Sequence, residues 1–290
     1  MPDQTKSALS AKRRRKGPGG ENSIPRVILC AGMKSSGSTW LYNVVFEIVK
    51  AGLRQKLAKR SAAWRTKIVQ FYGDRVSDFP PNAASAFHIV VKTHLPDSSL
   101  DFLMRFSSAR MFLTVREPRD AIASLMERFH HPFEGSLGDI GKGSVRIAHL
   151  RHAYNPPVFR YEDGFFDRRE TVAAIARMLN VPLSKAEIGR IFERHTKAAV
   201  RRRIVHLTSK GFFGEHASPD DFHPRSHWHP GHIGTGTVGK FAAILSISQQ
   251  RSVLAATAKY CRAFGYEDHF LRAPRERSPK RLANTINASI

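Results

Sequence analysis

The chain has 290 residues, 41% of them hydrophobic, which is enough for one large domain with a substantial core. Its formal net charge is +23, of which residues 1–26 and 267–290 carry only +5 and +2, so +16 falls on residues 27–266. Two cysteines exclude a disulfide framework, no run approaches the ~20 apolar residues of a membrane span, and a body this basic attracts polyanions.

Two basic tails, residues 1–25 and 267–290, are expected to be disordered and to flank one domain over residues 26–266. The basic run Lys12 to Lys16 is followed by GPGGEN and not by an apolar stretch, so it does not match a signal peptide. We interpret this run as a solvated tail, with binding to nucleic acid or to a surface as the alternative. The expected location is cytoplasmic.

A strand, a loop and a helix follow one another directly near the start of the domain. Val27 to Ala31 is a short apolar run that indicates a buried strand, and from Ser38 onward apolar residues recur at helical spacing. The glycine- and serine-rich loop between them, Gly32 to Ser38, therefore ends at a helix N-terminus. Unpaired N–H groups and the positive end of the helix dipole favour an anion at this position.

This loop has the spacing of a nucleotide-binding P-loop without its lysine. Gly32, Gly37 and Thr39 fit the pattern G-x-x-x-x-G-K-[ST], but Ser38 occupies the lysine position that contacts β- and γ-phosphates. Such a loop suits a smaller anion, for example one phosphate. The alternative is a tight strand-to-helix connection that binds no ligand.

Alternating strands and helices are predicted along the rest of the domain. The predicted strands cover residues 87–92, 111–115 and 157–161, and the predicted helices begin at Pro118, cover 172–179, begin after Ser184 and cover 247–264. Residues 206–240 are predicted to form a long loop, whereas residues 53–86 allow either a prolonged first helix or a loop. The alternation predicts a three-layer α/β fold in which helices flank a mostly parallel central sheet, as in P-loop NTPases. Cys30 and Cys261 are expected to be free thiols.

Five short motifs occur in an order that resembles a known family. They are Ser36-Gly37-Ser38-Thr39-Trp40, Lys92-Thr93-His94-Leu95-Pro96, Arg116 with Asp120 and Ser124, Tyr161-Glu162-Asp163, and Gly236-x-x-Gly239-Lys240-Phe241. Together they resemble the sulfotransferases that use 3′-phosphoadenosine 5′-phosphosulfate (PAPS), over about residues 26–266. The resemblance implies PAPS as cosubstrate, 3′-phosphoadenosine 5′-phosphate (PAP) as product, and no metal. The alternatives are a P-loop kinase, which Ser38 disfavours, and a non-catalytic protein that binds PAPS or polyanions.

The resemblance also assigns residues to the donor nucleotide. In the family, the first loop wraps the 5′-phosphate, an arginine and a serine hold the 3′-phosphate, and aromatic side chains with a threonine lie at the adenine. The corresponding positions are Lys34, Ser35, Ser36, Gly37, Ser38, Thr39, Trp40, Arg116, Ser124, Tyr161, Thr196, Gly234, Thr235 and Gly236. Of these, Arg116 and Ser124 match the 3′-phosphate pair, and Trp40, Tyr161 and Thr196 match the adenine positions.

Sulfuryl transfer requires an acceptor oxygen in line with the leaving oxygen, a base for the acceptor proton, and cations near the developing charge. The resemblance makes His94 the base, and an imidazole has a suitable ordinary pKa near neutrality. An ordinary loop histidine is the alternative for His94. Lys92, Lys34 and helix N-termini supply positive potential, so the chemistry requires no metal.

The sequence departs from the family pattern at three places. Ser35 stands where the family has a lysine or arginine, so either Lys34, one residue earlier, reaches the bridging oxygen or another cation substitutes. Gly234 and Thr235 replace the family's arginine and lysine before Gly236, so backbone N–H groups are expected to bind more of the 3′-phosphate. Ala198 falls where the family often has an aromatic residue that stacks on adenine.

Three histidines in the long loop, His227, His229 and His232, have the close spacing of metal ligands, but direct binding of an anion is the preferred interpretation. The expected acceptor offers a hydroxyl or an amine and is a small molecule, a glycan or a lipid, with anionic acceptors included; nucleic acid is not expected. Residues 53–86, 130–152 and 206–232 are expected to wall the acceptor site. The sequence specifies neither the acceptor nor an oligomeric state.

Overall fold

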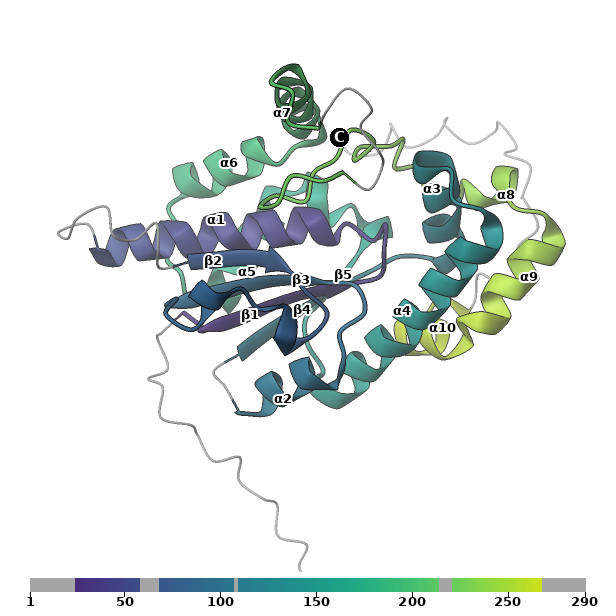
Figure 1. Ribbon diagram of the computed structural model, residues 1–290, viewed down its shortest axis with the longest axis horizontal. Helices are drawn as coiled ribbons and strands as arrows, with labels where there is room; N and C mark the ends of the chain where they lie inside the picture. Colours follow the sequence, from purple (N-terminus) through teal and green to yellow (C-terminus); the bar gives the residue numbers. More distant parts are fainter. Residues whose placement is uncertain (1–23, 58–67, 107–108, 214–220, 268–290) are drawn as a thin grey trace, which may run out of the picture.

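The computed structural model describes residues 24–57, 68–106, 109–213 and 221–267, so nearly all of the two predicted tails lies outside the described residues. Within these ranges, five strands form one sheet in which every pair is parallel (Figure 1). Their order across the sheet is β2 (Ile68–Tyr72), β3 (His88–Thr93), β1 (Val27–Gly32), β4 (Ala109–Val115) and β5 (Val158–Arg160).

Helices cover both faces of the sheet, because alternate residues of each central strand point to opposite sides. Ile28 and Cys30 of β1 pack under α1 (Ser38–Leu57), α5 (Arg169–Met178) and α6 (Lys185–Arg194). Val27, Leu29 and Ala31 pack under α3 (Pro118–Phe129), α4 (Phe133–Tyr154) and α10 (Ala258–Phe264). This arrangement, which Figure 1 shows with α1 on one face and α4 on the other, confirms the predicted three-layer α/β fold.

The remaining described helices lie around this frame. They are α2 (Ser98–Phe106), α7 (Lys197–Ser209), α8 (Phe241–Ile244) and α9 (Ile247–Ala256). None of the helices in the described ranges is long and apolar enough to cross a membrane.

The strand order places the candidate site. The chain moves from β1 outward to β2, returns to β3, and then continues with β4 on the other side of β1. The loops that leave the carboxyl ends of β1, β3 and β4 therefore open at one edge of the sheet, on both sides of the point where the strand order reverses. Ligand sites of open parallel sheets lie at such a point.

Several predicted elements are confirmed. β1, β3, β4 and β5 lie within a residue or two of the expected ranges, and Pro118 is the first residue of α3. The Ser184 side chain accepts a hydrogen bond from Glu187 N in a capping box that opens α6, and Gly265 ends α10 in the left-handed conformation. Cys30 and Cys261 are both buried free thiols.

Other expectations were wrong or incomplete. β2, α2 and α4 were not predicted at all. The predicted single helix over residues 247–264 is two helices, since the chain breaks at Thr257, and the predicted loop over 206–240 begins only after α7 ends at Ser209. β2 is a half-buried edge strand whose pairing with β3 decides its conformation, and α4 contains four glycines that lower its helix propensity.

Candidate active site

The loop after β1 owes its shape to close packing against β4. A Cβ atom on Gly32 would lie 2.0 Å from Thr114 Oγ1, so only glycine fits at this position. The Ser36 hydroxyl donates to Met33 O at 2.6 Å and lies 2.7 Å from Thr114 Oγ1, so this buried side chain holds the loop from inside. Gly37 adopts a φ of 86°, which glycine tolerates, and Trp40 N donates back to Gly37 O as α1 begins.

A cavity of about 390 Å³ lies at this edge of the sheet. The described residues that line it come from the loop after β1, the ends of β2 and β3, α3, the segment after β5, the start of α7 and the loop before α8. Those expected from the sequence are Lys34, Ser35, Gly37, Ser38, Thr39, Trp40, Lys92, His94, Arg116, Ser124, Tyr161, Gly234 and Gly236. Residues far apart in the sequence thus meet in one place.

Three expected site residues do not line the cavity. Ser36 points into the protein, as described above. Thr196 caps α7, where its hydroxyl accepts from Ala199 N at 3.3 Å and donates to Glu193 O at 3.2 Å, while its neighbours His195 and Lys197 do line the cavity. Thr235 is exposed between the two lining glycines.

The cavity has a strongly positive wall. Five cationic side chains line it, and no aspartate or glutamate is among its described lining residues; the cations are Lys34, Lys92, Arg116, Arg128 and Lys197. Lys34 pairs with Asp139 at 2.7 Å and Lys197 with Asp167 at 3.2 Å, both on the partly exposed rim. Within the described part of the chain, the other three cations have no carboxylate within ion-pair distance. Such a cavity binds an anion with several charges.

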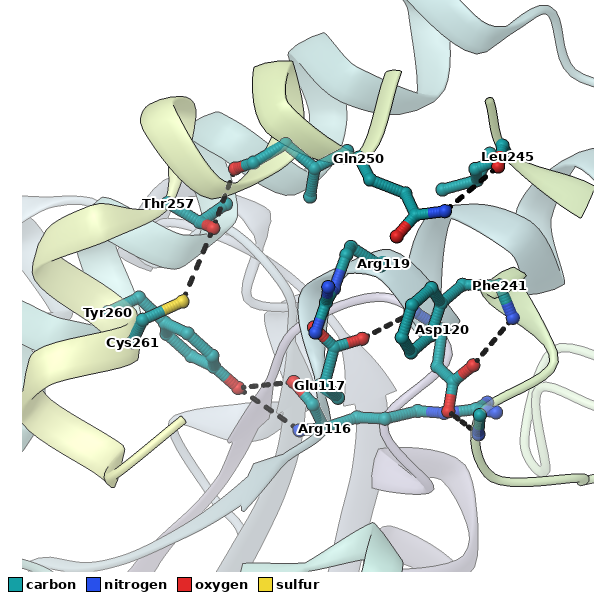
Figure 2. Close-up of polar contacts among 12 residues, drawn as sticks. Arg116, Glu117, Arg119, Asp120, Phe241, Leu245, Gln250, Thr257, Tyr260 and Cys261 are labelled. Atoms are coloured by element: carbon teal, nitrogen blue, oxygen red, sulfur yellow. Dashed lines mark hydrogen bonds and ion pairs between the residues drawn. The ribbon is translucent and has the colours of Figure 1, made fainter. Parts of the chain in front are cut away.

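Arg116 is held rigidly at the end of β4 (Figure 2). Its backbone N–H donates to the Tyr260 hydroxyl, which in turn donates to Arg116 O, both at 3.1 Å. The guanidinium donates to Ser35 O and Thr237 O at 3.2 Å and lies 4.0 Å from the ring centroid of Tyr161. Both groups that accept hydrogen bonds from the Arg116 guanidinium are neutral backbone carbonyls, so the positive charge of the guanidinium is available to a ligand.

Asp120, in the first turn of α3, holds the C-terminal wall of the cavity in place. Figure 2 shows its carboxylate against the segment that leads into α8. It accepts from Gly239 N at 2.6 Å and from Phe241 N at 3.1 Å. Ser124, which lines the cavity, lies one further turn along the same face of α3. Arg116, Asp120 and Ser124 thus lie together in the structure as their sequence spacing suggests. Arg116 and Ser124 line the cavity, whereas Asp120 holds the segment before α8.

His94 lies at the carboxyl end of β3 with a fixed tautomer. Its Nδ1 is 2.6 Å from Gly32 O, and since a carbonyl only accepts, Nδ1 carries the proton and Nε2 keeps its lone pair. Burial and the nearby Lys92 ammonium lower the pKa of His94 to about 3. The imidazole is therefore neutral at physiological pH with a free lone pair on Nε2, but its pKa lies below the near-neutral value that the sequence suggested for a general base.

Asp74, just past β2, fixes the backbone that carries His94. Its Oδ1 accepts from Thr93 Oγ1 at 2.5 Å, from His94 N at 3.1 Å and from Leu95 N at 2.9 Å, and its Oδ2 accepts from the Tyr72 hydroxyl at 2.8 Å. Burial alone would raise the pKa of Asp74, but these hydrogen bonds lower it below its usual value. The sequence did not identify Asp74, because β2 was not predicted.

Lys92 precedes His94 by two residues and is buried, and its ammonium has no hydrogen-bond partner among the described residues. Burial, together with Arg128, lowers the pKa of its ammonium to about 7. Its Nζ lies 5.8 Å from the ring centroid of Tyr72. A half-charged lysine at neutral pH is poised to take up a proton when an anion binds beside it.

Aromatic side chains form the far end of the cavity. Trp40 meets Phe165 edge to face at 5.5 Å between centroids, and Tyr161 lies 4.7 Å from Phe166. Lys197 Nζ lies 4.8 Å from the Phe166 centroid. This end offers flat apolar surface next to cations, which suits a purine base with a phosphate.

Sequence reasoning missed several lining residues, of which Arg128 is the most prominent. It lies four residues after Ser124 and so on the same face of α3, a spacing that would have identified it. Phe166, Lys197 and Phe222 lie in segments without a recognisable motif. The described residues contain no group of three or more histidine, cysteine or acidic side chains placed to hold a metal ion.

Comparison with known proteins agrees with this geometry. A family model described as the sulfotransferase domain matches residues 25–216. No curated protein sequence matches the chain. The wall formed by residues 221–241, and helices α9 and α10, lie beyond the family match.

Solved structures with a similar fold include two proteins with bound PAP. Retinol dehydratase in complex with androsterone and the inactive cofactor PAP shares 17% identity, covering 87% of this chain and 83% of that chain, with a TM-score of 0.54. Mouse sulfotransferase SULT7A1 complexed with PAP shares 14% identity, covering 85% and 87%, also with a TM-score of 0.54. At such identities the likeness shows the fold.

Proposed function

Because this chain belongs to the sulfotransferase family, we propose that it transfers a sulfuryl group from PAPS to the hydroxyl or amine of an acceptor. One observation carries the proposal. The anion-binding loop after β1, the Arg116 and Ser124 pair and the neutral base His94 all line a single cavity that has no carboxylate in its described wall.

The residues present fit PAPS. Within the described part of the chain, seven buried polar atoms of lining residues have no hydrogen-bond partner, and three of them belong to residues expected at the donor: Ser35 Oγ, Trp40 Nε1 and Arg116 Nε. Buried polar atoms are usually satisfied, so unpartnered ones in a cavity mark places for ligand atoms. Two of the three are donors only, as a ligand rich in phosphate oxygens requires. Trp40, Tyr161 and Phe166 supply the flat surface for the adenine.

The proposed mechanism gives each residue at the reacting centre one task. His94 Nε2 removes the proton of the acceptor group as the new bond to sulfur forms, and the Gly32 carbonyl stabilises the imidazolium through Nδ1–H. Lys92 lies close to His94 and supplies positive charge near the transferring group. The bond between sulfur and the bridging oxygen breaks, and that oxygen leaves with the electron pair as part of PAP.

Lys34 is the second cation available to the leaving oxygen. Its ammonium is paired with Asp139, but both side chains are 40% exposed. An ion pair this exposed contributes only ~0–1 kcal/mol, so a bound polyanion can compete for Lys34. We therefore retain Lys34 as a catalytic candidate, with Asp139 as the partner it would leave.

Of the two alternative functions, the kinase is disfavoured by the family match, whereas a non-catalytic binding protein is not. A P-loop kinase is disfavoured by family membership as well as by Ser38 in the loop. A non-catalytic protein that binds PAPS on the same fold would share the donor site, and only turnover separates it from an enzyme.

Selective binding of the donor nucleotide is the first test. Titration calorimetry should show PAP binding far above ATP with magnesium, because the site is built for phosphates on both ends of the nucleoside. Losing a charge-assisted contact costs ~1.5–3 kcal/mol, so Arg116→Ala should weaken PAP roughly ten- to a hundred-fold while changing adenosine 5′-phosphate little. Arg110→Ala, an exposed change at the other end of β4, is the control. Equal affinity for ATP and PAP contradicts the proposal.

A further inference from the structure

The cavity extends past His94 into a region that the donor nucleotide does not explain. The described lining residues in this region that have no role at the donor site include Arg128, Phe129, Phe222, His227, His229 and His232, whereas Lys92 is shared with the donor site. Because His94 stands at its border, the group that His94 deprotonates must come from a molecule bound here.

Arg128 is the central cation of this region. Its Nε donates to Gly231 O at 2.9 Å, and its Nη2 donates to His229 Nε2 at 3.3 Å. Among the described residues, Nη1 has no hydrogen-bond partner, and no carboxylate lies within ion-pair distance of the guanidinium. Burial lowers the pKa of Arg128 to about 10, so the group remains charged at neutral pH. A partly buried charge with no carboxylate partner among the described residues is costly and marks a place for an anion.

His229 adds a donor beside this guanidinium. Since Arg128 donates to Nε2, the proton of the neutral ring is on Nδ1, and Nδ1 is buried without a partner within the described chain. Burial and Arg128 lower the pKa of His229 to about 3, so the ring acts as a neutral N–H donor. The ring is fixed by Phe129, whose centroid lies 4.8 Å away.

Two more imidazoles and Lys92 complete the cluster. His227 Nε2 and His232 Nδ1 are also buried without a partner among the described residues. Burial and Lys92 lower the pKa of His227 to about 3, and Lys92 contributes to the same direction at His229 and His232. Among the described residues, Asp74 raises the pKa of Lys92, but its carboxylate already accepts four hydrogen bonds. This region therefore combines two cations, Lys92 and Arg128, with three buried ring nitrogens that have no partner among the described residues.

We propose that this region is an anion subsite for the acceptor, in which Arg128, His229 and Lys92 bind a carboxylate or phosphate that the acceptor carries near its reacting group. Phe129 and Phe222 flank the imidazoles and contact the apolar body of the same molecule. The substrate class is thus small hydroxylated or aminated acids or phosphate esters. The identity of the bound molecule as the sulfuryl acceptor rests on the proposed transferase function, whereas the binding of an anion at this subsite does not.

Binding of matched probes tests the subsite directly. The full-length protein, with and without saturating PAP, is titrated with 4-hydroxyphenylacetate, with 4-hydroxyphenyl phosphate and with the neutral 4-hydroxyphenylacetamide, and binding is followed by ligand-observed NMR. We expect at least one anionic probe to bind tenfold or more tightly than the amide. Arg128→Leu should abolish this preference, whereas Arg203→Leu, an exposed arginine beside Trp228 that does not line the cavity, should keep it.

A second variant and a second readout separate this role from folding and from donor binding. His229→Phe keeps a ring against Phe129 but removes the N–H donor, and should reduce the preference severalfold. PAP affinity should change less than threefold in both variants. The proposal is overturned if neither anion is preferred, if the preference survives Arg128→Leu, or if Arg128→Leu weakens PAP tenfold, which would assign Arg128 to the donor. Failure of PAP to bind contradicts the proposed function instead, and the titration without PAP still decides the subsite.

Discussion

Lys92 gives a prediction in which the burial and the charge of its ammonium set the sign of the effect. With only protein groups around it, burial and Arg128 hold the pKa of its ammonium near 7. A bound phosphate or sulfate is an opposite charge and raises that pKa again. Donor binding must therefore drive proton uptake at any pH where the free amine is populated.

The magnitude follows from the titration curve. A group with a pKa of about 7 is ~90% deprotonated at pH 8, so PAP binding should take up about 0.8–0.9 proton there if its pKa in the complex is about 9 or higher. The sign follows from the raised pKa in the complex: the contribution of Lys92 to PAP affinity is fully present below pH 7 and is lost as the pH rises above 7. Between pH 7 and 9 the affinity for PAP should fall roughly tenfold or more. Because the second pKa of a phosphate monoester is near 6, the phosphates of PAP are ~99% ionised at pH 8 and contribute almost no proton there.

Calorimetry in two buffers of different ionisation enthalpy measures this uptake at pH 8. Lys92→Met should bind PAP without proton uptake and with an affinity that is flat between pH 7 and 9. Lys142→Met, an exposed change on α4, should behave like the unaltered protein. Uptake near zero in the unaltered protein, or unchanged uptake in Lys92→Met, would refute the view that Lys92 faces the bound anion.

Four further substitutions test the reacting centre. His94→Ala should keep PAP affinity while lowering turnover ~10²–10⁴-fold, and a loss below tenfold where chemistry limits the rate removes His94 from the base role. Asp74→Asn keeps the shape but removes the charge that four donors share, so kcat and the melting temperature should fall while PAP affinity stays within threefold; unchanged kcat shows that the backbone of His94 is held without it. Lys34→Ala should lower kcat and kcat/KM together, whereas Asp139→Asn, which releases the Lys34 ammonium, should not lower either. Unchanged turnover in Lys34→Ala transfers the leaving-group role to Lys92.

The central strands and their loops could be predicted from the sequence because their signals are local. The apolar runs at β1 and β4 are too short for helices, so they indicate buried strands. The motifs that follow these runs stand directly at the carboxyl ends of the strands. β2 escaped prediction because an edge strand is only half buried and its pairing with β3 cannot be seen locally. Because Asp74 lies just past β2, its role in positioning His94 was not predicted either.

Other features depend on contacts between distant segments. Ser36 stands in the loop motif yet points inward, because Gly32 pairs with Thr114 in the register between β1 and β4, which brings the two hydroxyls together. The ion pair between Lys34 and Asp139 joins the loop after β1 to α4. This helix was not predicted, because its four glycines lower the helix propensity of the segment. Arg128 is the exception, since its spacing from Ser124 was available in the sequence.

Transfer of labelled sulfur is the measurement that tests the proposed function most directly. The protein is incubated with PAPS that carries radioactive sulfur and with pools of hydroxylated and aminated acceptors, including carboxylated and phosphorylated ones, and labelled products are separated from the donor. We predict acceptor-dependent transfer of label that Arg110→Ala retains and His94→Ala loses by a hundredfold or more. Tight PAP binding with no labelled product from any pool would contradict the enzyme and would identify the chain as a binding protein on the sulfotransferase fold.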